Sequence, residues 1–164
     1  MITYEDIKKD PTIRTYIAKA DESLLALGYT EHSFAHVTHV AEMAGYIMEC
    51  MGQPPRQVEL AKIAAYLHDI GNLINRVDHG QSGAVMAFRI LGEMGFEPEE
   101  IATIATAIGN HDEGTGVPVN QVAAGLPEMK TAEFLKLLKE KMAFVQMKPE
   151  FAKREVNVGF SGGE

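Results

Sequence analysis

The segment AAYLHDIG, residues 64–71, decides the fold prediction because two polar side chains follow a strongly apolar run. That run begins at Pro54-Pro55 and is so uniformly apolar that we expect a helix buried on most of its sides. Burying the imidazole of His68 beside the carboxylate of Asp69 is costly unless the two share a proton or a metal ion. A metal ion would satisfy both groups, and a hydrogen-bonded pair at a helix end is the structural alternative.

The rest of the chain up to residue 112 predicts short helices and no strand. Thr3 and Asp6 resemble a capping pair, and Asp10 before Pro11 predicts the start of a helix that continues to residue 28. Further helices are expected at 33–51, from about 84 to Gly92 or Gly95, and at 97–109. We therefore expect an all-α fold: a compact helical bundle over residues 1–125, and an atypical helix near 131–143 with an irregular tail over residues 126–164.

Composition limits the classes of partner. The chain has 164 residues and a net charge of −8, and that excess lies in residues 1–112, which also hold all six histidines and all six aspartates. An acidic chain argues against general nucleic-acid backbone binding and against an anionic membrane surface. The single cysteine and the absence of a signal-like or spanning segment predict a cytoplasmic protein. The oligomeric state is left open.

Three further histidines are candidate ligands. His36, His79 and His111 fall at helix ends or on the face of a helix that an antiparallel bundle would bring to the end occupied by His68 and Asp69. Taken singly, each is better explained as a polar-face, capping or solvated loop histidine. Their combination with His68 and Asp69 points to a metal site.

Four motifs in this order resemble the HD-domain superfamily of metal-dependent phosphohydrolases, in its His-Asp-Ile-Gly branch: HVTHVA (36–41), AAYLHDIG (64–71), HGQSGA (79–84) and IGNHD (108–112). The resemblance covers about residues 30–120. It implies that His36, His68 and Asp69 hold one divalent ion, and that Asp69 bridges to a second ion held by His79 and His111. One or two ions of Mn, Fe, Ni, Co, Zn or Mg are implied.

The resemblance also implies a reaction. A metal-bound hydroxide would attack the phosphorus of a small phosphorylated molecule, a nucleotide or dinucleotide, with Asp69 as the catalytic residue. Asn72, Arg76 and Arg89 are the candidates for contacting the substrate. Two alternatives are a di-iron oxygenase on the same fold and a non-catalytic binding module.

The sequence departs from the family pattern in places. His39 and Asn72 stand where family members usually carry Arg and often carry Lys, respectively, and no Asp or His follows Asp112, although the family expects a last aspartate ligand. Glu128 could substitute, but Pro127 interrupts the helix that would present it. The segment 142–158 is similar to the opening strand and turn of nitrilase-type hydrolases, without room for their catalytic groups.

Overall fold

The computed structural model describes residues 1–29, 33–112, 136, 139–140 and 143. The chain divides into two units, Met1–Val117 and Pro118–Glu164. The four described residues of the second unit are helical and fall within the helix expected near 131–143. The predicted boundary at residue 125 and the expected tail lie outside the described residues.

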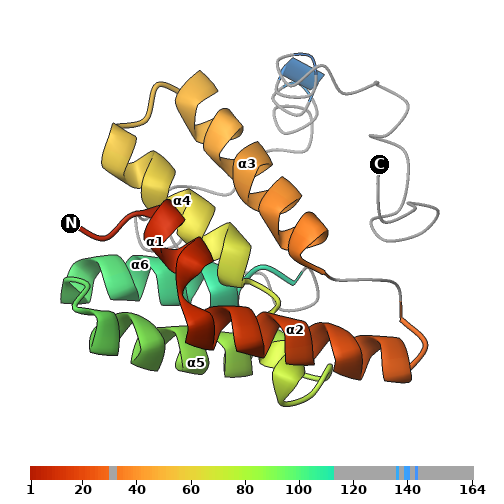
Figure 1. Ribbon diagram of the computed structural model, residues 1–164. Helices are drawn as coiled ribbons and strands as arrows, with labels where there is room; N and C mark the ends of the chain where they lie inside the picture. Colours follow the sequence, from red (N-terminus) through yellow and green to blue (C-terminus); the bar gives the residue numbers. More distant parts are fainter. Residues whose placement is uncertain (30–32, 113–135, 137–138, 141–142, 144–164) are drawn as a thin grey trace. The chain divides into compact units, whose positions relative to one another are not determined.

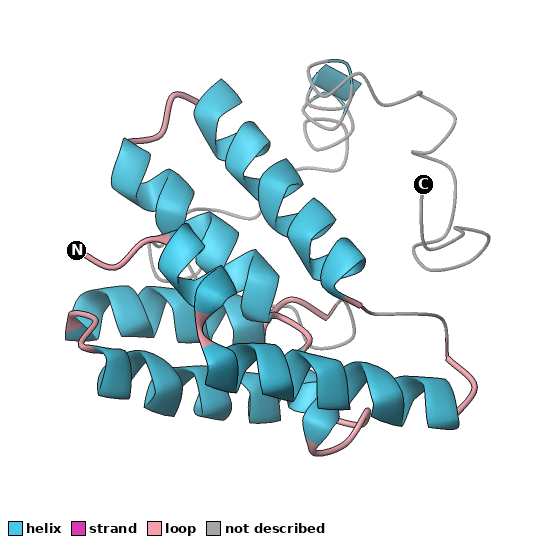
Figure 2. Cartoon of the chain, in the orientation of Figure 1, coloured by secondary structure: helices cyan, strands magenta, loops and turns pink. Residues whose placement is uncertain are grey.

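The first unit is built from helices, and the described residues include no strand (Figures 1 and 2). This confirms the all-α prediction. The elements are α1 (Tyr4–Lys9), α2 (Pro11–Ala26), α3 (Phe34–Cys50), α4 (Pro55–Leu67), the 3-10 helix η1 (Ile70–Leu73), α5 (His79–Met94) and α6 (Pro98–Gly109). Within the same residues, no helix is both long and apolar enough to cross a lipid bilayer.

Helix boundaries follow from capping chemistry. Thr3 and Asp6 form a reciprocal capping box, and the Asp10 carboxylate accepts from two backbone N–H groups of α2. Gly95, at φ 89°, ends α5 three residues after the alternative stop at Gly92. Glycine adopts this left-handed conformation without strain, which suits Gly95 as the residue at which the helix ends.

The core surrounds α4. This helix packs against α1, α3 and α6, while α5 packs against α6 and η1 and α2 packs against η1. Ile63 and Leu67 of α4 are fully buried, and Ile104 and Ile108 of α6 are buried beside them in the same core. The end of α4 and the start of η1 are therefore enclosed by helices, so His68 and Asp69 lie where several helices meet.

Gly71 and Asn72 belong to η1, which lies directly against the start of α5. A Cβ built on Gly71 would meet the carbonyl oxygen of His79, and would come within 2.5 Å of Gly83 N and 2.7 Å of Ser82 Oγ. Two of these three atoms belong to backbone that cannot move aside. Glycine at position 71 therefore permits η1 and α5 to approach closely, which holds His79 near Asp69.

Replacing Gly71 by alanine is expected to lower the free energy of unfolding by about 1–3 kcal/mol, because the new methyl group must push η1 away from α5. Urea denaturation followed by circular dichroism measures the change. Gly92→Ala is the matched control: its Cβ meets nothing within 4 Å, and alanine favours the helix. An equal loss of stability in both variants would contradict the close-approach argument.

Candidate metal centre

The site forms where α4 ends. His68 is the C-cap residue of α4, and Asp69 follows it directly before η1. Asp69 is 7% exposed, which is a costly environment for a carboxylate unless charged or hydrogen-bonding groups surround it. The neighbours of Asp69 therefore decide what the site is.

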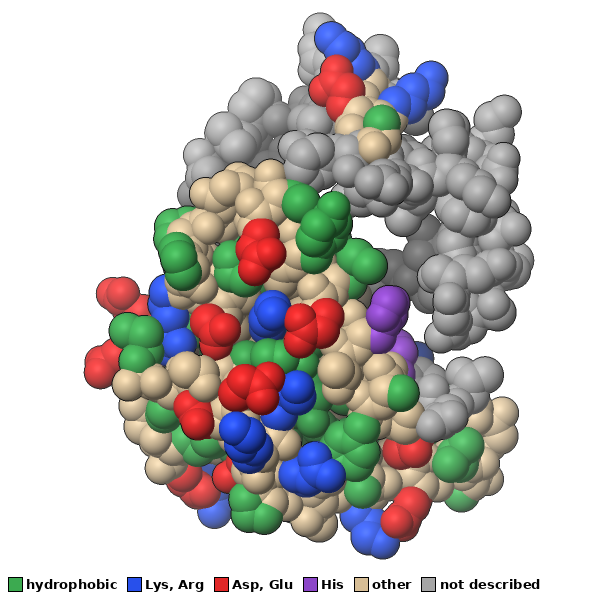
Figure 3. All heavy atoms as spheres, turned by 45° about the horizontal axis from the view of Figure 1, so that its top comes forward, with side chains coloured by type: hydrophobic (Ala, Val, Ile, Leu, Met, Phe, Trp, Pro, Cys, Tyr) green, Lys and Arg blue, Asp and Glu red, His purple; other side chains and the backbone are tan. Residues whose placement is uncertain are grey.

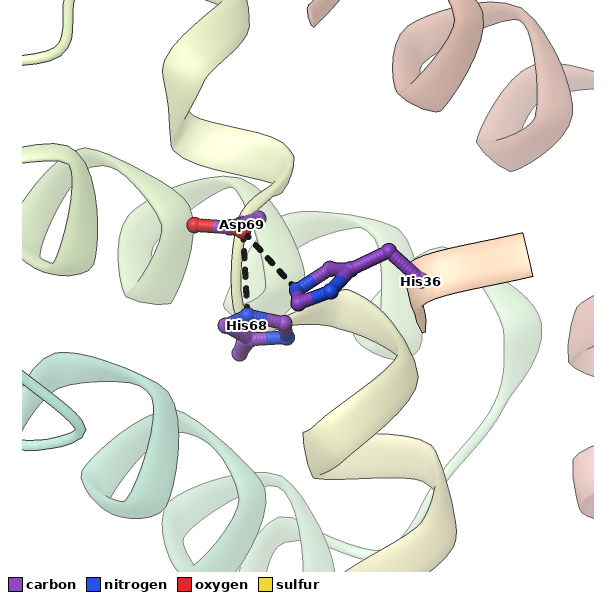
Figure 4. Close-up of side chains that lie close together, drawn as sticks. All are labelled: His36, His68 and Asp69. Atoms are coloured by element: carbon purple, nitrogen blue, oxygen red, sulfur yellow. Dashed lines mark ion pairs between the residues drawn. The ribbon is translucent and has the colours of Figure 1, made fainter. Parts of the chain in front are cut away.

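Two histidines approach one oxygen of this carboxylate. His68 Nε2 lies 3.0 Å from Asp69 Oδ2, and His36 Nε2, from the first turn of α3, lies 3.6 Å from the same oxygen (Figure 4). Asp69, His36 and His68 form a group whose candidate ligand atoms all lie within 4.8 Å of one another. The His36 side chain is 30% exposed, so this group reaches solvent.

The other carboxylate oxygen faces a second group. His79 Nε2 is 3.3 Å from Asp69 Oδ1 and 3.0 Å from His111 Nε2, and these three residues again place their ligand atoms within 4.8 Å. Asp69 thus belongs to both groups, one through each oxygen. The structure brings together all five residues that the sequence analysis proposed as ligands, in the two sets it proposed.

Backbone carbonyls orient three of the histidine rings. The Nδ1 atoms of His68, His79 and His111 lie 2.7, 3.1 and 2.7 Å from the carbonyl oxygens of Ala65, Arg76 and Ile108, each three residues earlier. A carbonyl only accepts, so each Nδ1 carries the proton and each neutral ring presents the lone pair of Nε2 to the cluster. Sequence reasoning missed these carbonyls, although the spacing of three residues at each helix end or turn is a readable signal.

This arrangement fits a divalent cation. With Nδ1 protonated, His79 Nε2 and His111 Nε2 would face each other with lone pairs 3.0 Å apart, which is repulsive unless a proton or a cation lies between them or beside them. Imidazole nitrogen and carboxylate oxygen are the donors that Zn, Mn, Fe and Ni accept. The donor chemistry therefore agrees with a metal at each group.

The electrostatics of the histidines diverge. Burial works to lower the pKa of His68, but the hydrogen bond and negative charge of Asp69 outweigh it and hold that pKa above its usual value. Burial lowers the pKa of His111, and the neighbouring His68 and His79 lower it further. Without a metal ion, His68 therefore takes up a proton more readily than an ordinary histidine, and His111 takes one up less readily.

Asn72 positions the carboxylate. Its side chain is 2% exposed, and its Nδ2 donates to Asp69 Oδ1 at 2.9 Å and to the Asp69 carbonyl at 3.0 Å. The Asn72 amide is thus used inside the protein to fix the direction of Asp69, and a contact between Asn72 and a substrate stays a prediction.

Arg76 and Arg89, the other predicted substrate contacts, lie in different places. Arg76 Nη1 is 3.8 Å from Asp69 Oδ1 and 3.3 Å from His79 Nε2, so this guanidinium borders the cluster. Arg89 is ten residues beyond His79, about 15 Å along α5, and pairs with Glu93 at 2.9 Å. The structure does not bring Arg89 to the cluster.

Two other residues were singled out in the sequence as departures from the family pattern or as a possible ligand. His39, one turn after His36 on α3, is exposed and outside both groups. Glu128, the proposed substitute for the last aspartate, lies outside the described residues. Figure 3 shows a small group of histidine side chains at the surface of one face, whose acidic and basic side chains lie elsewhere on that face.

Together, the helical bundle and this His/Asp cluster define a helical protein with a candidate binuclear metal site. The family description "HD domain" matches residues 33–145, which is more than half of the chain. The chain belongs to the HD-domain family. The match extends further toward the C-terminus than the resemblance seen in the motifs.

The matches to individual proteins have low identity or cover a short part of the chain. An uncharacterized protein of Methanocaldococcus jannaschii is 25% identical over 133 residues, covering 68% of this chain and 51% of its own. A probable ATP-dependent transporter of Guillardia theta is 48% identical over 44 residues, 27% of this chain and 17% of the transporter. The chain thus spans about half or less of these curated relatives. A crystal structure described as a predicted HD superfamily hydrolase, from an uncultured Thermotogales bacterium, is 26% identical with a TM-score of 0.49 and covers 94% of this chain and 97% of its own.

Asn72→Ala is expected to weaken divalent-metal binding by about 10–100-fold, because Asp69 loses the donor that fixes its direction. Isothermal titration of the metal-free protein with Mn²⁺ measures the affinity. Asn75→Ala is the control, since Asn75 is exposed and its side chain accepts only from Val77 N in the same turn. Equal affinities for the wild type and Asn72→Ala would contradict the positioning role.

Metal affinity is expected to fall as the pH falls through the raised pKa of His68, because a metal ion requires the neutral imidazole and must displace its proton. The sign follows from the direction of the shift: raising that pKa makes proton competition begin at a higher pH than for an ordinary histidine. Titrations with Mn²⁺ at several pH values between 5.5 and 8.5, roughly spanning the histidine range, measure this. An affinity independent of pH would contradict it.

Proposed function

We propose that this protein is a metal-dependent phosphohydrolase acting on a small phosphorylated molecule, with a nucleotide or dinucleotide as the substrate class. The observation that carries the proposal is the sharing of Asp69 between two histidine groups, one on each carboxylate oxygen. Membership of the HD-domain family supports the same chemistry.

The bound cations would supply a water molecule of lowered pKa and polarise the phosphoryl group. His36, His68, His79 and His111 would hold them, and Asp69 would keep them adjacent because it belongs to both groups. Asn72 fixes the carboxylate and the backbone carbonyls fix three of the rings, so the chain presents a preformed set of ligands.

Arg76 is the residue best placed to bind the substrate phosphate. Its side chain is 35% exposed while its Nη1 borders Asp69 and His79, so the guanidinium touches both the cluster and solvent. Arginine binds phosphate oxygens through charge-assisted, often bidentate, hydrogen bonds. A positive charge at this point also offsets the acidic balance of the chain, which by itself repels an anion.

A di-iron oxygenase is the second candidate. Four imidazoles and one carboxylate divided into two adjoining groups suit a pair of irons as well as other divalent ions. Iron-loaded protein that consumes dioxygen with an organic substrate, and shows a mixed-valent signal in electron paramagnetic resonance, would identify it. Metal binding with neither reaction would identify a binding module.

His68→Ala and Asp69→Ala are each expected to lower phosphate release by more than about 100-fold, since loss of a partner outside the ligand set already costs about 10–100-fold. The assay screens phosphorylated small molecules with Mn²⁺, Co²⁺, Ni²⁺ or Fe²⁺. His39→Ala is the matched control because this exposed histidine lies outside both groups. Unchanged phosphate release in His68→Ala or Asp69→Ala would refute the assignment.

A further inference from the structure

Tyr29 is fixed at the end of α2 by the backbone. The N–H of Tyr29 donates to the carbonyl of Leu24 at 3.0 Å, and the N–H of Gly28 donates to that of Leu25 at 3.0 Å. With Gly28 at φ 83°, these two bonds form a Schellman ending, which defines the direction of the chain as it leaves the helix. The backbone that carries the Tyr29 side chain is therefore held in one direction.

The aromatic ring of Tyr29 contacts Arg76, and Arg76 in turn borders the His/Asp cluster. The guanidinium carbon of Arg76 is 5.7 Å from the centroid of the Tyr29 ring, within the range of a cation–π contact. The same guanidinium reaches Asp69 and His79 through Nη1. Tyr29, Arg76 and the ligand set thus form a continuous row of contacts, with the aromatic ring at its outer end.

Tyr29 also stays available to a ligand, since the residue is 48% exposed. Isolated exposed aromatic residues are ordinary on protein surfaces. Tyr46 and Phe88 are exposed to a similar or greater degree, at 47% and 63%, but of these three exposed aromatic residues it is Tyr29 whose ring contacts the arginine that borders the cluster. Its position, not its exposure, distinguishes it.

We propose that Tyr29 is a specificity residue that stacks against a planar group of the substrate, attached to the phosphate that Arg76 binds. The substrate class is therefore a phosphate ester bearing an aromatic base. Stacking of a base on an aromatic side chain uses the face of the ring and tolerates different bases. This inference rests on the proposed phosphohydrolase function and adds to it a recognition element outside the ligand set.

The test compares two substrates that differ by the base alone, adenosine 5′-monophosphate and ribose 5-phosphate. The ratio of their kcat/KM values measures recognition of the base. Tyr29→Ala is expected to lower this ratio by about 10-fold, through the KM for the nucleotide, and Tyr29→Phe is expected to retain it because the ring face remains. A ratio unchanged in Tyr29→Ala while both kcat/KM values fall would overturn the proposal and leave Tyr29 as a positioning residue for Arg76.

A binding measurement separates this inference from the function itself. Isothermal titration of the full chain with each compound gives the preference for the base without turnover being required. A preference in the wild type that Tyr29→Ala loses supports the proposal even if no phosphate is released, whereas equal affinities for the two compounds in the wild type overturn it. Tyr46→Ala is the matched control, because Tyr46 is equally exposed and lies ten residues, about 15 Å along α3, from His36.

Discussion

The buried carboxylate of Asp69 is the group on which the rest of this structure depends. A carboxylate at 7% exposure requires compensation. Among the described residues, Asn72 donates to one of its oxygens and the Arg76 guanidinium lies near the same oxygen. His36, His68 and His79 place ring nitrogens beside the two oxygens, where a divalent cation would join nitrogen and oxygen. These groups come from α3, the end of α4, η1, the following turn and the start of α5. Residues from most of the helical unit therefore converge on this one carboxylate. Divalent cations would complete that compensation.

Close backbone packing makes this convergence possible. Gly71 lets η1 lie against α5, and Gly83 returns the contact, since a Cβ there would come within 3.2 Å of Gly71 N. Gly80 similarly faces Ile108 O and the ring of His111. The glycines in the DIG and HGQSG motifs thus permit the close packing that brings the neighbouring ligand residues together. This gives a physical reason why glycines and ligands occur side by side in these motifs.

The sequence predicted the local features best. Capping by Thr3 and Asp10 and the helical periods of α3 and α6 depend on near neighbours in the sequence. The order of the four motifs, in turn, indicated which helix ends carry the candidate ligands. The predictions that Asn72 and Arg89 contact a substrate depend on which way a side chain faces after packing, and near neighbours in the sequence do not determine that direction. Asn72 turns inward to Asp69, and Arg89 lies two to three turns beyond the cluster on α5. Tyr29 was not found at all, since nothing in its local sequence reveals that α2 ends beside Arg76.

The carbonyls that orient His68 and His111 belong to the last turns of α4 and α6, where backbone acceptors have no partner within their own helix. The end of each helix consequently supplies the carbonyl that orients the histidine ring. A substitution that prolonged either helix by one turn would engage those carbonyls and release the ring, whereas changes on the outer surface of the same helix would leave the ring untouched. The orientation of these two rings therefore depends on the main chain at the two helix ends, which side-chain substitutions elsewhere on the helices leave in place.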